Sequence, residues 1–263
     1  MTSLGLTITL LLLGLGLAIT AWVFIPALRG PLAARRHLGT HRLAFGSLVA
    51  VLLLNAVLTL PIAPMIGAGG SLTTGTFLIA ALSTQVPMLL VVYARLIAPG
   101  AVSWQELGLR WLPLERIVRV GLIAGLVGLV LSAIVSGLLS QIGLRPNQLD
   151  QLQFVRDEPP AVFLLILFSV AVSAPFTEEL FFRGFLFGLY RRRQPLWVAY
   201  AVPGVIFALL HLEPGRMNLA QMAGLAIGIF GLGMLLTWVY QRTGSLYPGM
   251  LAHVVNNATG LFL

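Results

Sequence analysis

Long apolar segments alternate with short polar ones along the whole chain, and this pattern predicts membrane-spanning helices. A helix needs about 20 mainly apolar residues to cross a bilayer core of about 30 Å. The stretches between the apolar segments are rich in Gly, Pro and Arg, which end or connect helices. We therefore expect an all-α integral membrane protein, a bundle of about eight transmembrane helices in one polytopic domain over residues 1–263. The candidate spans are residues 4–28, 43–67, 72–98, 118–143, 160–190, 196–212, 218–241 and 245–263.

Composition supports a membrane protein and argues against a soluble one. Of the 263 residues, 58% are hydrophobic and only 9% are charged, and the mean hydropathy is +0.96. The net charge of +8 comes from arginines, since the chain has no lysine. These arginines lie mostly in short connections between apolar segments, as anchors on the cytoplasmic side do. We expect the lipid bilayer as a partner and no nucleic acid. The absence of Cys excludes disulfides and a cysteine nucleophile.

The distribution of arginines predicts an orientation. Four follow the first span, four lie around the connection between spans three and four, three follow the fifth span, and one follows the seventh. The other side has only Arg145, Arg156 and Arg216. The positive-inside rule then puts both termini outside. We expect the membrane to be the cytoplasmic membrane of a prokaryote. The first apolar run lacks a basic leader and a small-residue cleavage site, so we expect it to be a retained span.

Two segments predict departures from simple spanning helices. The segment from Trp104 to Arg116 mixes Trp, Leu and charge, which favours an interfacial amphipathic helix. The fifth span has about 31 residues, or about 46 Å as a helix, which exceeds the hydrocarbon core. Pro175 removes a backbone hydrogen bond there. Thr177 can then cap a new helix that starts at Glu178. The fifth span can therefore tilt, project from the bilayer or break, and the sequence leaves these three alternatives open.

Ionisable residues inside this fifth span indicate a functional site. A charge at bilayer depth costs roughly 2.5–3.5 kcal/mol on the insertion scale. Glu179 and Arg183 are four residues apart, so they share a helix face and can pair. Glu178 is rotated by about 100° from Glu179 and points elsewhere. This spacing predicts one structural carboxylate and one free carboxylate able to act as a general base. The alternative is a purely structural network of all three groups.

His211 ends the sixth candidate span at a depth similar to that of Glu178. Glu178 lies 15 residues before Arg193, and His211 lies 18 residues after it. In an antiparallel hairpin, the carboxylate and the imidazole can therefore face one another. Phe207 lies four residues before His211, on the same face. The alternative for His211 is a hydrogen bond to a carbonyl or a lipid headgroup near a helix end.

His253 and Asn257 are again four residues apart, in the last apolar segment. Two neutral donors on one face can stabilise an oxyanion. The alternative is a polar contact that joins helices, which is common for His and Asn in membranes. Asn256 is rotated off the His253 face and is a weaker candidate. The glycines of AGLAIGIFGLG predict close helix packing.

Three short motifs on successive apolar segments, in the order EExxxR, FxxxH and HxxxN, resemble those of one family of membrane enzymes. FTEELFFRGFLFGLY and WQELGLRW are also similar to elements of that family. The chain resembles the CAAX protease and bacteriocin-processing (abortive-infection) family of intramembrane glutamic endopeptidases, to which the Ras-converting CAAX endopeptidases belong. The resemblance covers about residues 104–263, the expected catalytic core. The motifs are Glu178-Glu179-x-x-x-Arg183, Phe207-x-x-x-His211 and His253-x-x-x-Asn257.

The resemblance implies a catalytic role for four residues. Glu178 would activate water with assistance from His211. His253 and Asn257 would stabilise the tetrahedral oxyanion. No metal or other cofactor is expected, although the His and Glu side chains can also ligate zinc, which is the less favoured alternative.

The resemblance also implies supporting residues and a substrate class. Glu179 and Arg183 would hold the site together, with Phe207 beside them. The substrate would be a peptide or a membrane-associated protein, and the sequence leaves its identity and the oligomeric state open. A non-catalytic scaffold or immunity factor of the same fold and a proton-coupled transporter are the alternative functions. The transporter would show symmetric halves, and no internal repeat is visible.

Overall fold

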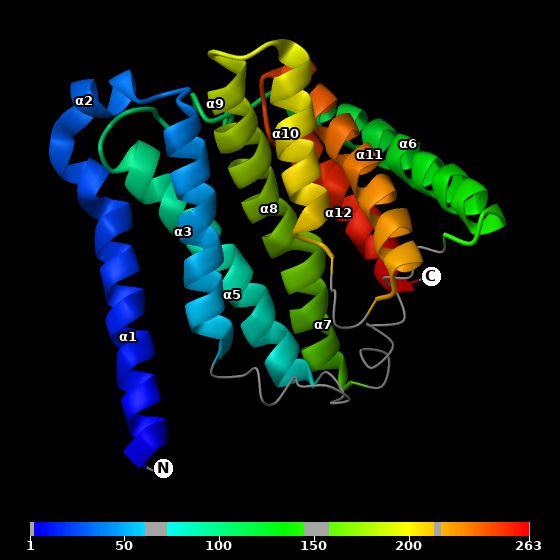
Figure 1. The fold of residues 1–263 in the computed structure, drawn as a ribbon. Helices are drawn as coiled ribbons and strands as arrows, with labels where there is room; N and C mark the ends of the chain where they lie inside the picture. Colours follow the sequence, from blue (N-terminus) through cyan, green and yellow to red (C-terminus); the bar gives the residue numbers. More distant parts are fainter. Residues whose placement is uncertain (1–2, 61–72, 145–157, 213–216, 263) are drawn as a thin grey trace. The chain divides into compact units, whose positions relative to one another are not determined.

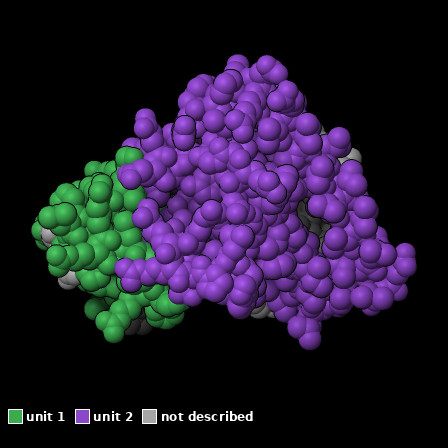
Figure 2. Space-filling view, turned by 90° about the horizontal axis from the view of Figure 1, so that it is seen from above, with its two compact units in different colours: residues 1–103 green, residues 104–263 purple. Residues whose placement is uncertain are grey.

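The computed structural model describes residues 3–60, 73–144, 158–212 and 217–262, and every regular element in these ranges is a helix. The described part of the chain is therefore all-α, as predicted. The chain forms two compact units, residues 1–103 and 104–263 (Figure 2). The second unit begins at the residue where the family resemblance is expected to begin. The single polytopic domain stays a prediction. The three outer-side arginines of the orientation argument, Arg145, Arg156 and Arg216, lie outside the described residues.

The first unit is a small helical bundle (Figure 1). In this unit α1 packs on α3 and α3 packs on α5. Asn55 on α3 donates a hydrogen bond to Thr84 on α5 at 3.1 Å. The Arg95 guanidinium lies 4.6 Å from the centre of the Trp22 ring. The helices are α1 (Ser3–Phe24), α2 (Gly30–Arg36), α3 (His41–Thr59) and α5 (Thr74–Val92), and a π-helical turn (Tyr93–Ile97) extends α5.

In the described part of the second unit, three helices pack on one long helix, and a fourth packs on two of those three (Figure 1). Two π-helical segments, Ser169–Ser173 and Glu179–Phe187, join α7, α8 and α9 into a continuous helix, Pro160–Arg191. Next, α10 returns along it and packs on α11, while α12 packs against α6, α11 and the middle of the long helix. The helices are α6 (Leu114–Gln141), α7 (Pro160–Phe168), α8 (Ala174–Glu178), α9 (Gly188–Arg191), α10 (Leu196–Leu209), α11 (Leu219–Thr243) and α12 (Tyr247–Phe262).

Five of the described helices are long and apolar enough to cross a membrane, which indicates an integral membrane protein. Two further apolar helices, Leu10–Phe24 and Leu196–Leu209, are shorter. The count of about eight spans therefore stays a prediction. The five are His41–Thr59, Thr74–Ile97, Leu114–Gln141, Pro160–Arg191 and Leu219–Thr243.

The long helix does not break at Pro175, so the structure excludes one of the open alternatives, a new helix capped by Thr177. Thr177 lies inside α8, and no side chain caps the segment that follows. The backbone instead widens into a π-helical turn before the proline, where the Ala174 N–H donates to the Ser169 carbonyl, five residues back. In a π-helical turn each N–H bonds the carbonyl five residues back instead of four. This change of pairing before Pro175 lets the helix continue through a residue that has no N–H.

The predicted interfacial helix near Trp104 is also wrong, because residues 104–113 form turns and extended chain. Gly108 has a φ of 103°, which favours glycine. Its carbonyl accepts from the Leu246 N–H at 2.8 Å, and the Leu107 carbonyl accepts from the Tyr240 hydroxyl at 3.3 Å. These tertiary bonds occupy carbonyls that a helix would use for its own backbone.

Three glycines on α6 allow α12 to approach closely. A Cβ atom on Gly125 would lie 2.9 Å from the Cβ of Val255. On Gly121 it would lie 2.7 Å from the side chain of Leu251, and on Gly128 it would lie 2.8 Å from the amide of Asn256. Because α12 carries His253 and Asn257, this contact fixes the position of two candidate site residues.

We predict that Gly125→Ala destabilises the protein by about 1–3 kcal/mol, because the added methyl group overpacks the contact with Val255. Thermal unfolding in detergent measures the change. Gly137→Ala is the matched control on the same helix, since nothing lies within 4 Å of a Cβ there. That variant should gain about 0.5–1 kcal/mol of helix preference. Equal midpoints for the two variants would contradict the close contact.

Candidate active site

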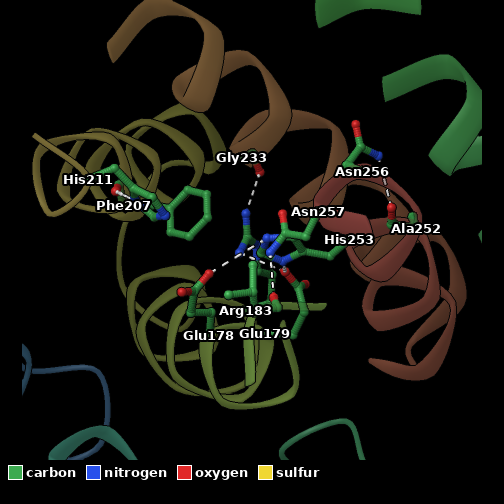
Figure 3. Close-up of polar contacts among 11 residues, drawn as sticks. Glu178, Glu179, Arg183, Phe207, His211, Gly233, Ala252, His253, Asn256 and Asn257 are labelled. Carbon is green, nitrogen blue, oxygen red and sulfur yellow. Dashed lines mark hydrogen bonds and ion pairs between the residues drawn. The ribbon is translucent and has the colours of Figure 1, made fainter. Parts of the chain in front are cut away.

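A buried ion pair joins Glu179 and Arg183 of the long helix (Figure 3). The side chains of Glu179 and Arg183 are 0% and 2% exposed, and Arg183 Nη1 donates to Glu179 Oε1 at 2.8 Å. The pairing predicted from their spacing is confirmed. Further partners help to offset the cost of burying such a pair, and here Glu179 Oε2 and Arg183 Nε have none among the described residues.

Arg183 connects three elements through its guanidinium. Nη2 donates to the Gly233 carbonyl on α11 at 3.2 Å. The guanidinium carbon lies 4.6 Å from the centre of the Phe207 ring on α10, which allows a cation–π interaction. Thr237 also donates to the Gly233 carbonyl, at 2.8 Å. The arginine therefore holds α10 and α11 against the long helix.

His253 brings α12 to the same cluster. Its Nδ1 lies 3.2 Å from Glu179 Oε1, and its Nε2 lies 3.6 Å from Glu178 Oε2. An ionised carboxylate only accepts hydrogen bonds, so Nδ1 is the donor to Glu179. Nε2 is then an acceptor in the neutral ring and becomes a donor only in the imidazolium.

The two adjacent carboxylates have different surroundings. Glu179 accepts from both Arg183 and His253 through Oε1. A Cβ atom on Gly249 would lie 3.1 Å from its other oxygen, so Glu179 is fully enclosed. The Glu178 side chain is 15% exposed, and its buried Oε2 accepts no hydrogen bond from the described residues. Oε2 of Glu179 also has no partner among the described residues, so the two carboxylates differ in ion pairing and exposure, and the role of Glu178 as a free base stays a prediction.

Phe207 lies between two imidazole rings. Its ring centre is 4.6 Å from that of His211 and 5.9 Å from that of His253, both edge to face. His211 Nδ1 lies 2.7 Å from the Phe207 carbonyl oxygen (Figure 3). Since a carbonyl can only accept, Nδ1 carries the proton, and Nε2 of the neutral ring is free to accept one. The predicted approach of His211 to Glu178 stays a prediction.

The two asparagines of α12 have backbone partners on different helices. Asn257 Nδ2 donates to the Val170 carbonyl on the long helix at 2.9 Å. Asn256 Nδ2 donates to Ala252 at 2.8 Å within α12 and to Gly125 on α6 at 3.2 Å. Asn256, which is off the His253 face, therefore joins α12 to α6 outside the cluster (Figure 3).

The side-chain arrangement bears on the zinc alternative. Within the described ranges, no group of three or more His, Cys, Asp or Glu side chains is arranged to hold a metal ion. Whether the site works without a metal stays a prediction.

Several groups of this site are not apparent from the sequence. The carbonyls of Val170 and Gly233 take part through the backbone, and Gly249 takes part through its lack of a side chain. The only signal is the glycine pattern of α11, which predicts close packing. That expectation is wrong at Gly228 and Gly231, where nothing lies within 4 Å of an added Cβ atom. At Gly233 an added Cβ atom would lie 3.8 Å from the Gly204 Cα, which is an ordinary contact between α10 and α11.

The fold and the site together define an all-helical membrane protein with buried Glu, Arg and His side chains contributed by several helices. Residues 160–259 match the family model described as type II CAAX prenyl endopeptidase Rce1-like. This match, which includes all three motifs, confirms the resemblance to the CAAX protease family over residues 160–259. The family is typically one of proteases, which supports a peptide hydrolase. No curated protein and no solved structure gives a significant match.

We predict that Glu179→Gln lowers the stability of the protein by about 3–5 kcal/mol, because it leaves the buried Arg183 charge without its counter-ion. Thermal unfolding in detergent and the yield of folded protein measure the change. Glu115→Gln is the matched control, because its carboxylate pairs with Arg119 on the surface and is 84% exposed. It should change stability by less than about 1 kcal/mol. A wild-type midpoint for Glu179→Gln would contradict a structural role for the pair.

Proposed function

We propose that this protein is an intramembrane glutamic endopeptidase that hydrolyses a peptide bond with water activated by Glu178. The observation that carries the proposal is the inequality of the two adjacent carboxylates. Oε2 of each carboxylate lacks a hydrogen-bond donor among the described residues. The two differ because Glu179 is fully buried, neutralised by Arg183 and bonded by His253 through Oε1, whereas Glu178 is 15% exposed, its buried Oε2 accepts no hydrogen bond and it is not part of the arginine ion pair. A carboxylate held in this way can accept a proton from water.

The reaction follows from the roles of these groups. Glu178 takes a proton from water, and the water oxygen attacks the carbonyl carbon of the peptide bond. His211 assists through Nε2, since its Nδ1–H is donated to the Phe207 carbonyl. Collapse of the tetrahedral intermediate breaks the C–N bond, and the proton held by Glu178 passes to the leaving amine.

His253 and Asn257 stabilise the oxyanion of the intermediate. Asn257 has two N–H bonds on Nδ2, one of which is donated to Val170, so the second is free for the oxyanion. His253 donates from Nε2 only as an imidazolium, because its Nδ1–H goes to Glu179. Two donors at a developing negative charge stabilise the transition state more than the ground state, and this lowers the barrier.

The substrate is a peptide or a membrane-associated protein, consistent with the family and the apolar surroundings of the site. The site lies in a multi-pass protein of the cytoplasmic membrane, and the reaction needs no cofactor. A scaffold or a proton-coupled transporter of the same fold would hydrolyse nothing, so peptide hydrolysis itself discriminates these functions.

We predict that Glu178→Gln abolishes hydrolysis while the protein stays folded, because the amide keeps the shape but cannot accept the proton. The probes are internally quenched peptides ending in a CAAX motif, with and without a prenyl group, assayed in detergent. Glu115→Gln on the surface is the control and should keep wild-type turnover. Wild-type turnover in Glu178→Gln would exclude the mechanism. If the unaltered protein hydrolyses neither these probes nor a peptide library, a scaffold or a transporter is favoured.

We predict that hydrolysis survives stringent chelation, because water is activated by a carboxylate.

Asn257→Ala should lower turnover by about 10²–10³-fold, with less effect on KM, because it removes an oxyanion donor. An amide is a poor zinc ligand, so a zinc site would tolerate this change. Metal analysis of the purified protein accompanies the kinetics. Stoichiometric zinc together with near-normal turnover of Asn257→Ala would favour the zinc mechanism instead.

A further inference from the structure

The side chain of Asn257 is held by a main-chain carbonyl of another helix. Its Nδ2 donates to the Val170 oxygen at 2.9 Å. Val170 lies inside the π-helical turn Ser169–Ser173, where backbone carbonyls are normally bonded within the helix. A mid-helix carbonyl has two lone pairs and can accept from a side chain beside its helical N–H, as the Gly233 and Ala252 carbonyls do. Where that N–H is missing, the side chain becomes the donor that satisfies the carbonyl.

Two local features remove the helical partners of the Val170 carbonyl. In an α-helix the donor would be the N–H of Ala174, four residues on. That N–H donates to Ser169 instead, five residues back. In the π pattern the donor would be the residue at position 175. That residue is Pro175, which is buried and has no N–H.

We propose that Pro175 is a positioning residue: together with the π-helical turn, it leaves the Val170 carbonyl open as the anchor that orients the Asn257 amide. The amide has two N–H bonds in one plane, so fixing one bond on Val170 also fixes the direction of the second. This inference rests on the proposed function, in which that second N–H meets the oxyanion. Pro175 itself touches no reacting atom and acts through Asn257.

The anchor also explains why a helix-interior proline lies three residues before Glu178. An unpaired carbonyl in an apolar interior costs free energy comparable to a lost hydrogen bond. The Asn257 donor satisfies that carbonyl, and the carbonyl orients the donor. The defect in the long helix and the polar residue of α12 therefore stabilise each other.

A double-mutant cycle tests the proposal. Pro175→Ala brings a backbone N–H to position 175, which can bond the Val170 carbonyl and release Asn257. We expect turnover to fall by about tenfold to hundredfold through misorientation, with little change in KM. In an Asn257→Ala background the same substitution should have no further effect, because the side chain on which it acts is gone. The kinetics use the same quenched peptides.

Two further variants complete the experiment. Pro175→Ser brings the same N–H with a different side chain and repeats the cycle where Pro175→Ala folds poorly. Pro87→Ala is the matched control, a buried helix-interior proline on α5 in the other unit, and should leave turnover unchanged. The unfolding midpoint of each variant is measured in parallel.

The outcomes separate this inference from the proposed function. Coupled effects of Pro175→Ala and Asn257→Ala on turnover support it. Additive losses would mean that the proline acts only on the stability of the helix, which overturns the positioning role and leaves Glu178 chemistry intact. Wild-type turnover in Pro175→Ala also overturns it. Wild-type turnover in Asn257→Ala would overturn both this inference and the oxyanion role.

Discussion

The arrangement of the second unit depends on the burial of the Arg183 charge. The guanidinium lies in the apolar interior, where an unpaired ion costs several kcal/mol. It meets a carboxylate on its own helix, a carbonyl on α11 and an aromatic face on α10. Glu179 then accepts from His253 on α12. One ion pair therefore requires four helical elements to come together, and this places the candidate site where they meet.

The same requirement separates the two carboxylates. Because Glu179 neutralises Arg183, it is unsuited to accept a proton from water. Glu178 lies one residue earlier, next to the ion pair but outside it, with His253 Nε2 at 3.6 Å. The pair of glutamates thus supplies a structural anion and a candidate base from neighbouring positions. Residues 160–259 match a family of CAAX endopeptidases, and this match supports the proposal that Glu178 is the base.

The candidate site also depends on irregular backbone in the long helix. One π-helical segment lies before the acidic pair in the long helix, and a second begins at Glu179. They change the rotation per residue and free a carbonyl that a side chain of α12 uses. Glycines on α6 have a related effect, since they let α12 approach to a distance that any side chain would prevent. Both devices act through missing atoms, an N–H in one case and a Cβ in the other.

The sequence by itself determined the class of protein, the Glu179–Arg183 pair and the order of the motifs that identified the family. These follow from local rules: apolar length sets spanning helices, and a spacing of four places two side chains on one helix face. The tertiary structure decided that the long helix continues through Pro175, that residues 104–113 are not helical, and that Asn257 bonds the Val170 carbonyl. Hydropathy and periodicity describe side chains on a regular helix. They do not specify which main-chain groups lose their helical partners or which distant side chain satisfies them, because those contacts form only when separate helices pack together.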